Sequence, residues 1–339
     1  MSRRFIPGAA IVGDVSSRAR IYAAVAAAAA LAAVIAVGAA VLPGDEPGPP
    51  APAPAATPRA GTPPLALDLG VRDDAEARAL RRAASLYERE RTADALALFS
   101  RYGSLEARVG ASFARWPVGT VDRLQQLAGL YPRSALVQLH LGLARYWARL
   151  PGAEQAWREA ADVEPDTPYA VVAGDLLHPE FARGLPLFLP SFETPAAIRA
   201  QPPAQQLAAL ERAAASGGVR EKLLYGVALQ RLGRPRSAER VFAAAGRLAP
   251  DDAEAQVAAA VGRFAKDAPA VAFSQLGPLA RRFPDEPTVR FHLGVLLLWT
   301  GRVEEAKRQL GLARKTRPGS PLAREAERYL ERIEQAEKG

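Results

Sequence analysis

An internal period of 34 residues constrains this chain more than any other feature of its sequence. Three blocks, 219–252, 253–286 and 287–320, align without a gap, and position 32 of each block is a proline: Pro250, Pro284 and Pro318. A period of this length is typical of a solenoid, because a single repeat cannot bury its apolar face except against its neighbours. The sequence therefore predicts stacked helical units over 219–320.

The residues inside each block predict a pair of closely packed helices. Positions 8 and 20 carry only Gly or Ala, whereas position 24 carries a large apolar residue: Phe242, Leu276 or Leu310. Small residues allow two helices to approach, and the large one fills the space between them. The proline at position 32 ends the second helix, because it cannot continue a helical hydrogen-bond pattern. Gly233 and Gly301 fall at the turn between the helices.

This spacing resembles the tetratricopeptide repeat, and the third block, FHLGVLLLWTGRVEEAKRQLGLARKTRP, is the best match. The resemblance implies an all-α, tetratricopeptide-like solenoid of helix–turn–helix repeats. One N-terminal transmembrane helix, expected from residues 21–42, would precede it. We expect a degenerate array over 72–167 and a Pro-rich connector over 168–203. The regular array would then occupy 204–320, and 321–339 would form a capping helix.

The N-terminus predicts a membrane anchor. Residues 21–42 are uncharged and would span roughly 33 Å as a helix. Four arginines precede this segment, so the positive-inside rule predicts a cytoplasmic tail at 1–20 and an extracytoplasmic remainder. A Pro/Ala-rich linker follows at 43–68. A cleaved signal peptide is the alternative, although the apolar run is longer than usual for one. The excess of Ala, Pro and Arg is typical of a bacterial protein.

The resemblance places a partner-binding groove on the first helices of the regular repeats. The residues that carry over to groove positions are mostly apolar with a basic edge: Arg220, Leu223, Val227, Gln230, Arg231, Val257, Val261, Phe264, Phe291, Val295, Leu298 and Trp299. The Lys and Asn that clamp a peptide carboxylate in some relatives are absent from these positions, so that mode of binding is disfavoured.

Three interpretations of an apolar groove stay open. A partner's helix or extended segment could lie in it, with Phe291 and Trp299 as anchors. The chain's own apolar patch at 185–192, or the capping helix, could fill it instead. In the third interpretation, tight packing of the solenoid buries these side chains.

Little in the sequence points to catalysis. With no cysteine there is no disulfide, Cys-bound metal or Cys nucleophile. His140 and His292 each precede Leu-Gly at the same repeat position, so the repeat pattern accounts for them. His178, with Asp175 and Glu180 nearby, lies in a Pro-flanked loop. No phosphate loop, dinucleotide fingerprint or nucleophile elbow appears. We therefore expect no enzyme activity, no catalytic residue, no cofactor and no metal.

The net charge of +8 does not predict nucleic-acid binding, because basic and acidic residues alternate along the helices. We expect a single-pass membrane scaffold that binds a protein or peptide in the groove of its repeats, in the cell envelope. The alternative is an accessory to an envelope enzyme, or a small-ligand or lipid-binding protein, with its site in 168–203. The partner, the pathway and the oligomeric state are not determined by the sequence.

Overall fold

The computed structural model describes residues 57–338 and divides the chain into two compact units. Of the described residues, the first unit contains 57–69, Asp73–Pro132 and Leu136–Ala156, and the second contains mainly Trp157 onward. The predicted cytoplasmic tail (1–20) and transmembrane helix (21–42) lie outside the described residues. None of the described helices is both long and apolar enough to cross a bilayer. The described part of the chain is all-helical, as the repeat pattern predicted.

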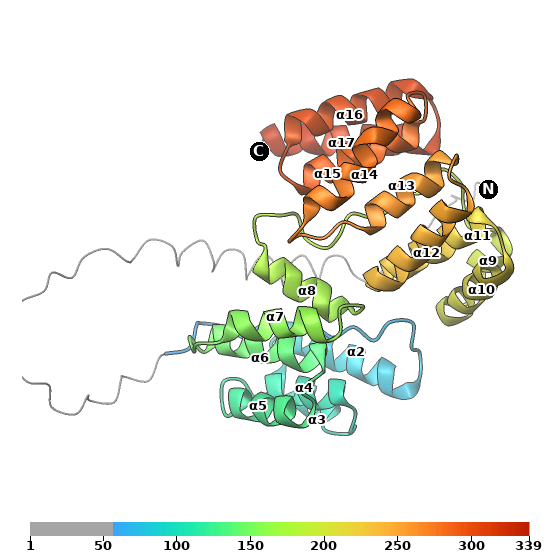
Figure 1. The fold of residues 1–339 in the computed structure, drawn as a ribbon. Coiled ribbons are helices and arrows are strands. Elements are labelled where there is room, and N and C mark those ends of the chain that lie inside the picture. Colours follow the sequence, from blue (N-terminus) through green and yellow to red (C-terminus); the bar gives the residue numbers. More distant parts are fainter. Residues whose placement is uncertain (1–56, 339) are drawn as a thin grey trace, which may run out of the picture. The chain divides into compact units, whose positions relative to one another are not determined.

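The N-terminal unit is built from consecutive short helices (Figure 1). Its core includes buried side chains from several of these helices, among them Leu80, Phe99, Phe113 and Leu139. The division between the units falls inside the last helix of the series. The helices are α2 (Ala75–Glu88), α3 (Thr92–Phe99), α4 (Leu105–Phe113), α5 (Thr120–Leu130), α6 (Ala135–Trp147) and α7 (Ala153–Val163).

The C-terminal unit contains the three regular repeats and a capping helix (Figure 1). Each second helix ends two residues before the proline at repeat position 32, as predicted. The helices are α8 (Pro168–Leu177), α9 (Ala196–Arg199), α10 (Pro203–Ser216), α11 (Val219–Arg231), α12 (Pro235–Leu248), α13 (Ala253–Gly262), α14 (Pro269–Arg282), α15 (Pro287–Trp299), α16 (Val303–Thr316) and α17 (Pro321–Lys338).

The small residues at repeat position 8 lie where the sequence predicted close helix packing. A Cβ on Gly294 would lie 2.8 Å from Leu310, the large residue at position 24 of the same repeat. Gly226 faces Phe242 in the same way and leaves even less room. Gly233 and Gly301, at the turns, have φ angles of +65° and +72°, a region that glycine adopts without steric cost. The repeat pattern is therefore confirmed as a packing pattern.

Two non-helical segments depart from their predicted roles as linker and connector. Residues 59–69, the end of the predicted linker 43–68, pack onto the N-terminal unit, with Leu65 and Leu69 buried. The predicted connector 168–203 contains α8 and α9, and between them residues 185–192 pack into the core of the C-terminal unit, where Phe188 is fully buried. We call these segments the N-terminal strap (59–69) and the C-terminal strap (185–192). Both departures have the same cause, because each segment contains apolar side chains that are buried but follow no helical period.

Candidate functional site: two grooves filled by straps

The C-terminal groove lies on the first helices of the repeats. Helix α13 contacts both α11 and α15, so these three helices lie side by side. The predicted groove residues Leu223, Val227, Val257, Val261 and Phe264 are buried in one apolar cluster. Phe291 and Val295 form a second cluster, against which Leu298 and Trp299 pack. The fold therefore brings these predicted groove residues together.

The C-terminal strap fills this groove with its apolar side chains. Phe188 belongs to the first cluster; its ring contacts Phe242 edge-on, with centroids 5.6 Å apart, and stacks on His292 at 4.9 Å. Leu189 packs against the second cluster. Of the three interpretations left open by the sequence, the structure matches the one in which the 185–192 patch occupies the groove.

Side chains from all three groove helices also bind the backbone of the strap. The N–H of Phe188 donates to Gln230 Oε1 on α11 (3.0 Å), and the N–H of Ser191 donates to Glu254 Oε1 on α13 (2.7 Å). The N–H of Leu189 donates to Nε2 of His292 on α15 (2.9 Å). Burial raises the pKa of the Glu254 carboxyl, an effect that the hydrogen bonds from Ser191 oppose. The strap is thus bound through its main chain as well as through its apolar side chains.

The partners of His292 determine its tautomer. Its Nδ1 lies 2.7 Å from the carbonyl oxygen of Thr288, which can only accept, so Nδ1 must carry the proton. Nε2 is then unprotonated and accepts the N–H of Leu189. Burial lowers the pKa of His292 to about 4, which keeps the imidazole neutral at pH 7. Nε2 of the ring is therefore a hydrogen-bond acceptor for the strap.

The N-terminal unit repeats this arrangement with His140. Its Nδ1 lies 2.6 Å from the carbonyl oxygen of Leu136, and its Nε2 accepts the N–H of Ala66 in the N-terminal strap (3.2 Å). Burial lowers the pKa of His140 to about 4 as well. The repeat pattern accounted for the position of both histidines, but it did not reveal their bonds to the straps. Their identical place before Leu-Gly was the available signal.

Other side chains of the N-terminal unit bind carbonyl groups of its strap. The Tyr87 hydroxyl donates to the carbonyl of Pro63 (2.6 Å), and the Trp116 indole donates to that of Gly61 (3.1 Å). At the start of the strap, the N–H of Arg59 donates to the carbonyl of Trp147 (2.8 Å). The guanidinium of Arg59 lies over the ring of Tyr146, 4.1 Å from its centroid.

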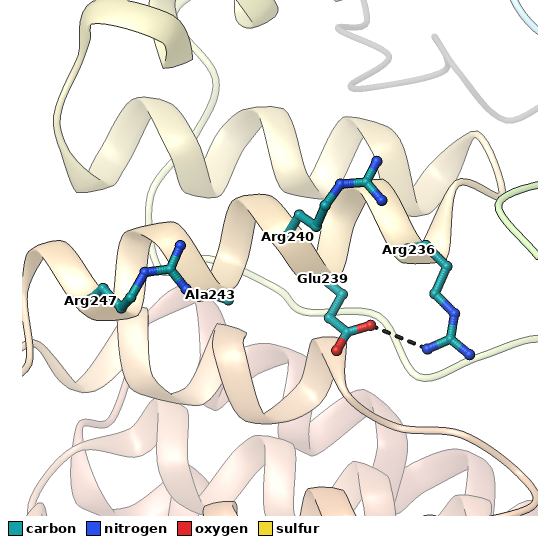
Figure 2. Close-up of a pocket in the computed structure, with 5 residues that line it drawn as sticks. All are labelled: Arg236, Glu239, Arg240, Ala243 and Arg247. Atoms are coloured by element: carbon teal, nitrogen blue, oxygen red, sulfur yellow. Dashed lines mark hydrogen bonds and ion pairs between the residues drawn. The ribbon is translucent and has the colours of Figure 1, made fainter.

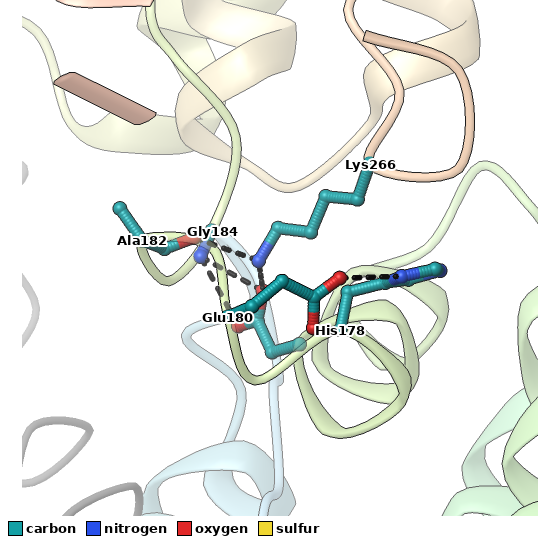
Figure 3. A network of polar contacts seen from close by, with 6 residues as sticks. His178, Glu180, Ala182, Gly184 and Lys266 are labelled. Atoms are coloured by element: carbon teal, nitrogen blue, oxygen red, sulfur yellow. Dashed lines mark hydrogen bonds and ion pairs between the residues drawn. The ribbon is translucent and has the colours of Figure 1, made fainter. Parts of the chain in front are cut away.

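The ends of the C-terminal strap are also held. Before it, Asp175 and Lys266 form a buried ion pair (2.5 Å); Lys266 also donates to the carbonyl of Ala182, and Gly184 N–H donates to Asp175 (Figure 3). Burial raises the pKa of the Asp175 carboxyl against the opposing effect of Lys266. At the end of the strap, Arg220 lies over the ring of Phe192, 4.6 Å from its centroid.

These contacts involve the polar side chains of the loop in which the alternative function would place its site. Asp175 is taken up by Lys266 and Gly184, while His178 and Glu180 form a separate exposed pair at 3.3 Å. In the described part of the chain no group of His, Asp or Glu residues could hold a metal ion. A hollow of about 350 Å³ on α12 is lined by Arg236, Glu239, Arg240, Ala243 and Arg247 (Figure 2). There the Arg236–Glu239 ion pair (3.2 Å) is open to solvent.

The fold and the grooves define a protein of tetratricopeptide-like helical repeats whose grooves hold its own chain. No family model matches the sequence. No curated protein matches it either.

Two solved structures show similarity. YrrB, described as a TPR protein with an unusual peptide-binding site, has 16% identity over 61% of this chain and 99% of that one, with a TM-score of 0.31. The Cut9–Hcn1 hetero-tetramer of APC/C has 14% identity over 75% of this chain and 55% of that one, with a TM-score of 0.24. The repeat assignment rests on the helix pairs of this chain.

Proposed function

We propose that this protein is a membrane-anchored repeat scaffold that binds a segment of a partner protein in the cell envelope and has no catalytic activity of its own. One observation supports it above all: three helices of the groove direct side-chain acceptors at the main chain of a non-helical segment. Acceptors arranged in this way can hold a peptide backbone whatever its side chains. The apolar clusters beside them supply pockets for side chains.

The membrane anchor is the second part of the proposal and rests on residues 21–42 and their basic flank. The chain has no cysteine, so single engineered cysteines report topology directly. In intact cells, a membrane-impermeant maleimide should label a Ser274→Cys variant, whose residue lies on the exposed side of α14, and leave Ser17→Cys unlabelled. Labelling of Ser17→Cys alone would show the opposite topology. Labelling of both variants would contradict a membrane-spanning segment between the two positions.

Partner binding is tested by photo-crosslinking in membranes. A photoreactive amino acid at Arg231, the exposed last residue of α11 beside the groove, should give a discrete adduct identifiable by mass spectrometry. The same amino acid at Leu312 on α16, which is 44% exposed, is the matched control. The same adducts at both positions, or none at Arg231, would contradict binding at the groove.

A further inference from the structure

The two straps share a sequence pattern as well as a histidine. In the N-terminal strap Pro63 precedes buried Leu65 by two residues, and the next N–H, of Ala66, donates to His140. In the C-terminal strap Pro186 precedes buried Phe188 by two residues, and the next N–H, of Leu189, donates to His292. Each unit thus binds the pattern Pro-x-Φ, where Φ is Leu or Phe, followed by one donated N–H.

We propose that both grooves are sites for one class of ligand, a non-helical peptide with the pattern Pro-x-Φ, and that a partner segment of this class displaces the C-terminal strap. The inference rests on the proposed function and adds to it the chemistry of the partner segment and the competitor that it must displace. The strap is then a tethered copy of the ligand, which blocks the groove until a better-fitting segment arrives.

The C-terminal strap is the one that a partner can replace. It makes three backbone N–H bonds to the groove; Pro186 and Phe188 are buried, while Leu187 is 39% exposed. The N-terminal strap is held by bonds to its carbonyls as well as its N–H groups. A segment held by fewer hydrogen bonds opens more readily while the rest of the fold persists.

The strap also leaves one donor of the groove unused. The indole Nε1 of Trp299 is buried and has no hydrogen-bond partner within the described residues. Trp299 packs against the same cluster as Leu189, so it lies beside the occupied groove. An unpaired buried donor is costly, and a ligand that supplies a carbonyl here gains an advantage over the strap.

The test uses the full chain in detergent and a fluorescent peptide with the sequence of residues 183–194. We expect the Phe188→Ala chain, whose own strap is weakened, to bind this peptide at least tenfold more tightly than the unaltered chain, measured by fluorescence anisotropy. Leu187→Ala, in the same strap but partly exposed, is the matched control and should bind like the unaltered chain. A peptide with Ala in place of its Phe should not bind.

The role of the histidine is tested in the Phe188→Ala background. His292→Phe keeps an aromatic ring but removes the Nε2 acceptor, and we expect it to weaken peptide binding by about fivefold, the effect of one hydrogen bond. Circular dichroism verifies that each variant is folded. Failure of the peptide to bind a folded Phe188→Ala chain would overturn the proposal.

Hydrogen exchange in the unaltered chain tests whether the peptide displaces the C-terminal strap, even if Phe188→Ala does not fold. Excess peptide should accelerate exchange at the amides of Phe188, Leu189 and Ser191, because the strap leaves the groove. If these amides exchange as slowly as those of α15 with and without peptide, the strap is a permanent part of the core and the proposal is wrong. Peptide binding without any crosslinked partner would uphold the site and contradict the scaffold function.

Discussion

The N-terminal and C-terminal units both pack consecutive helices around an apolar core, but their sequences follow the repeat with different regularity. The C-terminal unit follows the 34-residue period closely, and the N-terminal unit follows it only in degenerate form. Yet in both units a neutral histidine before Leu-Gly accepts an N–H from a non-helical strap. The remaining bonds differ: Tyr87 and Trp116 donate to strap carbonyls in one unit, whereas Gln230 and Glu254 accept strap N–H groups in the other. The histidine–strap bond is therefore independent of the regularity of the repeats.

The largest expected effect of a single substitution is at Phe188. Phe188→Ala removes a fully buried ring from the C-terminal groove, and we expect the unfolding free energy of that unit to fall by about 3–4 kcal/mol. Leu187→Ala, at a partly exposed neighbour, should cost less than about 1 kcal/mol. Hydrogen exchange under mild denaturant measures the unfolding free energy of each unit separately. Equal losses for the two variants would mean that the strap is not anchored by its Phe.

Acid should weaken each unit through its buried histidine, and the two histidine contributions should be similar. The folded-state pKa of His140 and His292 is about 4, below the ordinary value of 6.5, so the unfolded chain binds more protons between these values. The stabilisation is complete above pH 6.5 and is lost as the pH falls toward 4, by about 3 kcal/mol for each unit. Denaturant unfolding at pH 7 and pH 4.5 measures it.

The variant His292→Phe tests whether each unit loses stability in acid through its own histidine. His292→Phe should abolish the histidine component of the pH dependence in the C-terminal unit and leave it unchanged in the N-terminal unit. An effect on both units would refute the comparison, because each unit is argued to have its own histidine.

We expect Leu65 of the N-terminal strap to stabilise the N-terminal unit less than Phe188 stabilises the C-terminal unit. Leu65→Ala removes a smaller buried side chain, and we expect a loss of about 2–3 kcal/mol in the N-terminal unit alone. The same unfolding experiment measures it. A chain in which Leu65→Ala leaves this unit unchanged would show that residues 59–69 are only a linker, as their composition suggested.

The smallest effect concerns a single hydrogen bond. Tyr87→Phe removes the donor to the carbonyl of Pro63 while keeping the ring, and about 1 kcal/mol should be lost from the N-terminal unit. Trp116→Phe removes an exposed bond to Gly61 and should cost less, as judged from thermal unfolding of both variants. The reverse order would mean that burial does not set the strength of these bonds.

Periodic features of the molecule could be predicted from the sequence, and non-periodic ones could not. The helix pairs and the small residues at Gly226 and Gly294 follow from a spacing that repeats, and the groove residues follow from the resemblance to the tetratricopeptide repeat. The patch at 185–192 was recognisable as a candidate to fill the groove, but its bonds were not, because they join residues up to 103 positions apart. The packing of Leu65 in a Pro-rich stretch had no periodic signal at all.

The tautomer of the two histidines tests the account most directly. Long-range proton–nitrogen NMR spectra of the ¹⁵N-labelled protein report which ring nitrogen carries the proton. We expect His140 and His292 both to be protonated on Nδ1 alone at pH 7 and to stay neutral until the pH approaches 4. A proton on Nε2 of either ring, or titration near pH 6.5, would show that these histidines do not accept the N–H groups of the straps.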